Sequence, residues 1–142
     1  MKLKSRIPYI ELTDDIMDFA VNKLKEYESW NVYKFPGTGR SNLFKYLPEA
    51  QLPAAVVNYD SSSYRKSGGG AARTMQFEII IAVEFFTDDD KCLLREMLHK
   101  VIELLDSEVF NAKVSFDVIS DTALDLGSGV AAYVIKFNAL NY

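Results

Sequence analysis

The sequence contains very little cysteine and histidine, two residue types that are common in metal and catalytic sites. Among its 142 residues it has one cysteine, Cys92, and one histidine, His99. A disulfide within the chain is therefore impossible, and no metal site made of several histidines or cysteines can form. A lone cysteine is also consistent with a reducing compartment.

The sequence also lacks long apolar runs and an excess of basic residues. Because no stretch of about 18 apolar residues is present, we expect no membrane span. The first residues, MKLKSRIPYIEL, carry charge but no sustained apolar segment, so we expect no signal peptide. The 20 aspartates and glutamates outnumber the 16 lysines and arginines, which gives a net charge of -4. This charge disfavours wrapping of nucleic acid through phosphate neutralisation, and we expect no sequence-specific nucleic-acid partner.

The composition is that of an ordinary folded protein, with 49% hydrophobic and 25% charged residues. The length predicts a single α+β domain over residues 1–142, which can bury a core without a disulfide or a metal. Aromatic residues make up 13% of the chain and can fill either a core or an interface.

Two segments show helical periodicity. The first predicted helix is Thr13–Glu28, with Thr13 as its N-cap, and Pro8 upstream favours an extended entry. The second begins with a capping-box-like sequence at Thr87–Asp90 and runs to about Asp106.

Five segments have the composition or alternation of strands, and the order of elements is α-β-β-β-α-β-β. This order predicts a mainly antiparallel sheet with both helices packed on one face. Ser41–Gln51 is predicted as a loop with a helical turn, and Asp60–Ala72 and Ser120–Gly129 are predicted as loops. The predicted strands are Trp30–Phe35, Ala54–Tyr59, Arg73–Phe86, Lys113–Ile119 and Val130–Tyr142.

Arg73–Phe86 is the longest predicted strand, and at about 3.3 Å per residue it would span roughly 45 Å. With Ala54–Tyr59 it predicts a long β-hairpin that protrudes from the body of the domain. One face of the strand is apolar, whereas the other, which includes Gln76 and Glu78, is mostly polar. That second face is expected to meet water, a lumen or a neighbouring chain.

The tip of this hairpin is basic. It carries Arg65, Lys66 and Arg73 against Asp60. The tip is either a solvated turn or a surface that docks on an acidic neighbour or a second copy. Its glycines are expected to leave it unordered until a partner binds. The residues predicted to contact a subunit or partner are Tyr64, Arg65, Lys66, Arg73, Gln76 and Glu78.

No motif predicts a catalytic, cofactor or metal site. Gly37–Ser41 lacks the spacing and the lysine of a phosphate-binding loop, and Gly68–Gly70 precedes a strand instead of a helix. Asp88–Asp90 lacks the spacing of a calcium loop and suits a helix N-terminus. His99 is predicted on a solvated helix face, and Cys92 as a small packed side chain. We therefore expect no enzymatic activity.

In the order and spacing of its elements, the chain resembles phage tail-terminator and related minor tail (head–tail joining) proteins of tailed bacteriophages and prophages. The first matching features are a capped helix near the start, Thr13–Glu28, and the first strand of the hairpin, Leu52–Val57. The second hairpin strand, Arg73–Phe86, leads directly into an acidic helix start at Asp88–Asp90, and Gly129–Phe137 is the closing strand.

The resemblance implies an α+β subunit that forms a homo-oligomeric ring, commonly hexameric, at the end of a tail tube. Such a ring belongs to the virion tail, assembles in the host cytoplasm, contacts tail-tube and head-completion proteins, and lets DNA pass through its lumen. A negative net charge would suit that lumen. Arg73–Phe86 would lie partly at the subunit interface, with its edges paired to a neighbour. The resemblance implies no catalytic residues.

Two other hypotheses remain from the residues alone. The first is a stand-alone protein-binding module or adaptor that uses its sheet edge to hold a peptide or protein. The second is a small enzyme with a pocket between the helices and the Tyr33–Arg40 loop.

Overall fold

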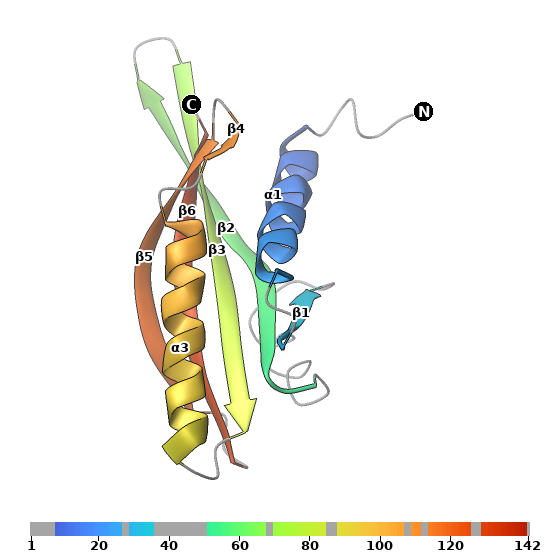
Figure 1. The fold of residues 1–142 in the computed structure, drawn as a ribbon. Coiled ribbons are helices and arrows are strands. Elements are labelled where there is room, and N and C mark those ends of the chain that lie inside the picture. The colour runs from blue at the N-terminus through green and yellow to red at the C-terminus, as the bar shows by residue number, and fades with distance from the viewer. Residues whose placement is uncertain are drawn as a thin grey trace.

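The structure, a computed structural model, describes residues 8–26, 29–35, 51–67, 70–84, 88–106, 109–111, 114–125 and 129–141. It confirms the predicted α+β class and the predicted order of elements, to which it adds one short strand, β4, before β5 (Figure 1). In chain order the elements are α1 (Pro8–Leu24), β1 (Asn31–Lys34), β2 (Ala54–Ser67), β3 (Gly70–Glu84), α3 (Asp88–Leu105), β4 (Val109–Asn111), β5 (Val114–Asp125) and β6 (Val130–Asn141).

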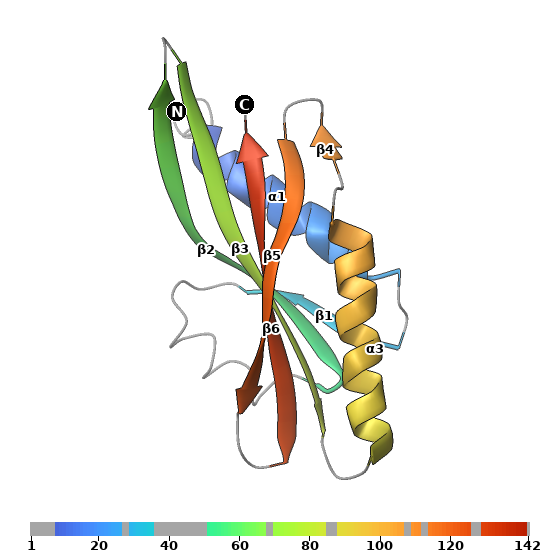
Figure 2. The same ribbon diagram turned by 90° about the vertical axis from the view of Figure 1, so that its left-hand side faces the viewer.

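The strands form one six-stranded sheet in the order β1-β2-β3-β6-β5-β4. β1 and β2 run parallel, and every other pair of neighbours is antiparallel, as predicted. The β2–β3 hairpin extends beyond the other strands at one end of the sheet, here called the hairpin end (Figures 1 and 2). β3 lies in the middle, with β2 along one edge and β6 along the other. Its edges are therefore paired within the chain, and the expected pairing of this strand with a neighbour is wrong.

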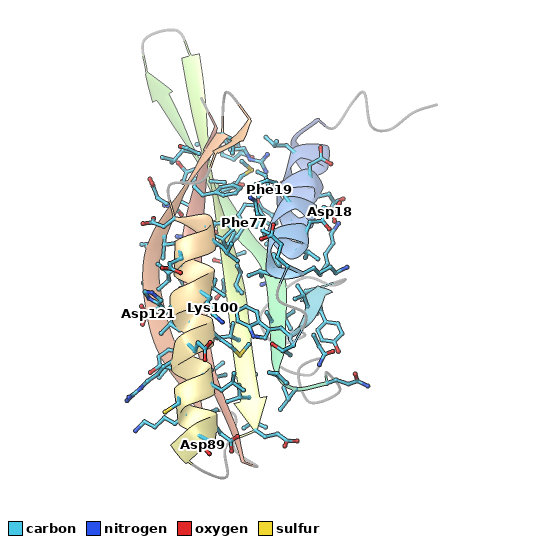
Figure 3. All side chains as sticks on the ribbon, viewed as in Figure 1. Asp18, Phe19, Phe77, Asp89, Lys100 and Asp121 are labelled. Carbon is cyan, nitrogen blue, oxygen red and sulfur yellow. The ribbon has the colours of Figure 1, made fainter. Side chains whose placement is uncertain are left out.

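Both helices pack on one face of the sheet, and the main core lies between them. The inward positions of β3 alternate as predicted, and Phe77 is one of them. Its ring stacks on Phe137 with centroids 5.3 Å apart, and Phe137 packs edge-on against Phe116 at 5.6 Å. Phe19 of α1 completes the aromatic row 5.6 Å from Phe116 (Figure 3). Full burial of side chains of this size contributes about 1.5–3 kcal/mol each.

The opposite face of the sheet is less polar than the alternation in β3 predicted. Ile80 and Ala82 are buried there, in a second apolar cluster with side chains from three other segments. The rest of the cluster is Phe35, Val56, Ala132 and Val134. Polar side chains occupy this face mainly toward the hairpin end.

The start of α1 differs from the prediction. The helix begins at Pro8, five residues before the predicted N-cap, and Thr13 is buried inside it. Proline suits the first helical position because its missing N–H would have no intrahelical partner and its φ is already helical. The sequence therefore contained the correct start signal at Pro8, and the Thr13 hydroxyl is left for a tertiary contact.

The predicted loop at the hairpin tip is mostly strand. β2 and β3 stay in register from Ser61 opposite Gln76 to Ser67 opposite Gly70, after one bulge between Tyr59 and Ser61. The prediction failed because both faces of this segment are polar, so it shows no alternation, although the antiparallel ladder is satisfied all the same.

β5 was also predicted too short, because it continues to Asp125 through the segment expected to be a loop. Of the predicted loop Ser41–Gln51, residues 41–50 lie outside the described residues, and so does Thr87 of the predicted capping sequence. Within α3, His99 is exposed as predicted.

Cys92 is exposed, and its predicted packing is wrong. The buried side of α3 is set by Leu94, Met97, Val101 and Leu105, and a residue two positions before Leu94 falls on the other side of the helix.

Candidate assembly surfaces

A buried arginine joins the base of the protruding hairpin to α1. Arg73 was predicted to be an interface residue at a basic tip, yet its side chain is only 7% exposed and lies on the helix-covered face. Its Nη2 donates to Thr13 Oγ1 at 3.2 Å, and its Nε donates to Ser62 Oγ at 3.1 Å. Because a buried guanidinium is costly without partners, these contacts fix the hairpin against α1.

The neighbours of Arg73 extend this polar network along β2. Ser62 Oγ also shares a hydrogen bond with the Tyr59 hydroxyl, and the Tyr59 ring lies 5.4 Å from Phe77 between centroids. Tyr64, opposite Arg73 in the ladder, has its ring centroid 6.0 Å from Arg73 Cζ. The Tyr64 side chain is nevertheless 63% exposed. Among Tyr64, Arg73, Gln76 and Glu78, the predicted interface residues whose side chains the structure describes, it is the most exposed.

The predicted site residues Gln76 and Glu78 lie on the other face of β3, in two rows of cross-strand partners. Gln76 is half-buried, and its Oε1 accepts a hydrogen bond from Ser61 Oγ at 3.4 Å. Glu78 is 1% exposed beside Asn58, which is also buried. Following the register across β2, β3, β6 and β5, we call these rows the polar band: Ser61, Gln76, Asn138 and Asp117, then Asn58, Glu78, Lys136 and Ser120.

The backbone positions of the remaining predicted site residues are also known. Arg65 pairs with Ala72 and Lys66 with Ala71, so both lie in the part of the hairpin beyond the last pair of β3 with β6. The six predicted residues are thus not one surface. Arg73 faces the helices, Gln76 and Glu78 face the opposite side, and Tyr64 is exposed.

The two outer strands of the described sheet cover only short parts of their neighbours. β1 pairs with β2 at Ala54–Val57, and β4 pairs with β5 at Val114 and Ser115. Within the described part of the chain, no strand pairs with the outer side of β2 over 58–67 or of β5 over 116–125. We call these the β2 free edge and the β5 free edge. A strand edge with unpaired N–H and C=O groups is a template for pairing with another chain.

The β5 free edge was not predicted from the sequence. It is rich in exposed side chains, among them Asp117, Ile119 and Asp121, and Figure 3 shows Asp121 at the margin of the molecule. A signal was present: Thr122 is β-branched, and no glycine or proline interrupts the sequence between Val114 and Gly127.

β1 is tied to α1 by an ion-pair cluster. Lys34 Nζ lies 3.0 Å from Asp18 Oδ1 and 3.4 Å from Asp14 Oδ1. Partial burial lowers the pKa of Lys34, but the hydrogen bond to Asp18 and the charges of both aspartates outweigh it and raise the pKa above its ordinary value. The cluster thus links β1 to α1 at the sheet margin, next to the part of β2 that β1 covers.

Two further observations concern other kinds of site. No three histidine, cysteine, aspartate or glutamate side chains gather to hold a metal ion in the part of the chain that the structure describes. Neither described helix is both long and apolar enough to cross a membrane.

Comparison with known proteins gives a likeness of fold. No protein-family model and no curated protein sequence matches the chain. Among solved structures, the chain is similar to a protein chain in the virion of a native gene transfer agent (GTA) particle, with a TM-score of 0.51 and 13% sequence identity. The similarity covers 78% of this chain and 77% of the other. The protein therefore shares the fold of a chain found in a virion particle.

Proposed function

We propose that the protein is a structural component of a phage-like virion, of tail-terminator type. In this proposal it assembles as a homo-oligomeric ring at the end of the tail tube, within the host cytoplasm, and joins tail to head. Its partners are further copies of itself, tail-tube proteins and head-completion proteins, and it has no catalytic role. The observation that carries the proposal is the shared fold with a virion protein over more than three-quarters of both chains.

The two faces of the sheet support a place in a ring. One face is sealed by both helices, and the other presents the polar band across four strands. If the helices face outward, the exposed part of the polar band lines the lumen, where DNA would pass. Glu78 and Asn58 are buried, so the charged members of the band that reach the surface are Lys136 and Asp117. These two do not form the continuous basic surface that binds phosphates tightly. Such a lining would let DNA slide through.

The proposal is tested in particles from cells that carry the gene. We expect mass spectrometry of purified particles to detect the chain at a few copies per particle, and gold-labelled antibodies to mark the junction between head and tail. Particles that lack the chain, or labelling spread along the whole tail, would contradict a terminator role.

A second candidate is an adaptor that binds one peptide by adding it as a strand, and the β2 and β5 free edges favour it. An adaptor would remain monomeric at all concentrations and would be absent from purified particles. A pull-down from the source cells would then return a partner whose bound segment becomes protected from hydrogen exchange.

A further inference from the structure

We propose that the β2 free edge of one copy pairs with the β5 free edge of a second copy, as antiparallel strands. The contact is head to tail, so each copy uses a different edge toward each neighbour and the sheet continues from copy to copy. Only the closing of the copies into a ring rests on the proposed function. The edge contact itself can be measured on the isolated chain.

The first support is the matching extent of the two edges. Each contains one bulge, between Tyr59 and Ser61 in β2 and between Val118 and Ser120 in β5. A bulge disrupts pairing locally, which leaves regular strand at 61–67 and at 120–125. These two stretches have nearly the same length, as two strands that form one ladder need.

The second support is where the exposed apolar side chains lie. Two large hydrophobic side chains are exposed in the described structure, Tyr64 at 63% and Ile119 at 49%. One lies on each free edge. Tyr64 lies within the regular stretch of β2, where a paired strand would cover part of its ring, and Ile119 is the extra residue of the β5 bulge, at the end of the paired stretch.

The third support is charge. The β5 free edge carries Asp117, Asp121 and Asp125 and no basic residue, whereas the β2 free edge carries Asp60 against Arg65 and Lys66. Two β5 edges brought together would repel, because each has three carboxylates. A β2 edge beside a β5 edge brings opposite net charges together, which favours the head-to-tail contact over the two-fold one.

The fourth support is strand direction. Since β2, β3, β6 and β5 are each antiparallel to the next, β2 and β5 run in opposite directions within one copy. A second copy turned about an axis roughly along the strands therefore presents β5 antiparallel to β2. The two edge strands thus already have the relative direction that an antiparallel ladder needs, and neither has to refold.

The two free edges are offset along the sheet. In the register, Asn58 is level with Ser120, so the β2 edge extends toward the hairpin end and the β5 edge toward the other end. Pairing them shifts each copy along the strand direction relative to the last. A constant stagger is what the tilted strands of a closed barrel require, so the offset is compatible with a ring.

The experiment uses two variants, each with one edge blocked. Tyr64→Asp removes the exposed ring and adds negative charge to the β2 edge, and Asp121→Lys reverses a charge on the β5 edge. Asp89→Lys makes the same charge reversal at an exposed site on α3 and is the matched control. Circular dichroism and thermal melting establish that all three variants are folded.

We expect the wild type and the Asp89→Lys variant to form the same oligomer by light scattering, and each edge variant alone to be monomeric. Mixed in equal amounts, the two edge variants should associate with each other by native mass spectrometry, because each supplies the intact edge that the other lacks. Edge variants that keep the wild-type mass, or a mixture that stays monomeric, overturn the proposal.

Cross-linking detects the edge contact even where it is too weak in the free protein to give a stable oligomer. Ser63→Cys and Ala123→Cys, both at exposed positions and each in a Cys92→Ser chain, are mixed with a bismaleimide linker. We expect links between the two different variants to exceed links within either one about tenfold. Equal or absent linking overturns the edge contact. If the isolated chain forms the head-to-tail contact but is absent from purified virions, the proposed function is wrong and the edge contact stands. If the chain forms a ring in virions and the edge variants still assemble there, the edge contact is wrong and the proposed function stands.

Discussion

The centre and the margins of the sheet differ in how their backbone and side chains are satisfied. β3 and β6 lie between other strands, and their inward side chains are fully buried beneath the helices. The β2 and β5 free edges have one unpaired side in the described structure and many exposed side chains. Burial at the centre thus provides most of the stability of the fold, while the free edges have backbone N–H and C=O groups that can still pair with another strand. In this protein, stability and assembly can be changed separately.

The largest expected difference between centre and margin is in amide hydrogen exchange. In the monomer, amides of Ile79, Ile80 and Ile81 should exchange only through global unfolding, and outward amides of the free edges through small local openings. The central amides should be slower by about three orders of magnitude or more. NMR or mass spectrometry measures this, and free-edge amides that are equally protected in the monomer would contradict the comparison.

Deleting a central side chain should cost far more than deleting a marginal one. Phe77→Ala removes a ring from the stacked row and should lower the free energy of unfolding by about 3–5 kcal/mol. Ile119→Ala on the β5 free edge should change it by no more than about 0.5 kcal/mol. Urea denaturation of the monomer tests both, and a cost at Ile119 as large as that at Phe77 would show that the β5 edge belongs to the core.

The hairpin should depend on its polar anchor to an intermediate degree. Thr13→Val keeps the shape of the side chain but removes the hydroxyl that accepts from Arg73, and should cost about 1–3 kcal/mol. Ser63→Ala, which removes an exposed hydroxyl from the same hairpin, is the control and should have almost no effect. Equal losses in the two variants would mean that Arg73 does not anchor the hairpin through Thr13.

The smallest effect is expected at the ion-pair cluster of β1. Lys34→Met should cost about 0.2–1 kcal/mol, because the lysine is about one-third exposed and solvent screens the pairs. The raised pKa means that the contribution is complete at neutral pH and is lost as the pH rises through the folded-state pKa of Lys34. Unfolding free energies measured at neutral and alkaline pH, with Lys25→Met as control, should therefore converge between wild type and variant only at alkaline pH.

The sequence by itself determined the two helices, the apolar alternation of β3 and the α+β class. Each depends on apolar residues that recur at a fixed spacing along the chain, because one side of a helix or strand is buried. It also located the hairpin and the closing strand, and it indicated an exposed histidine at position 99. The start of α1 at Pro8 was readable as well, but an N-cap at Thr13 competed with it.

Only the tertiary structure decided which polar residues are available to a partner. The charge of Arg73 suggested an exposed tip, and its burial follows from Thr13 and Ser62, which are distant from it along the chain. The far halves of β2 and β5 carry polar side chains on both faces, so no local period reveals them as strands. Their free edges exist because β1 and β4 are short, and that is a property of strand order in space and not of any local segment.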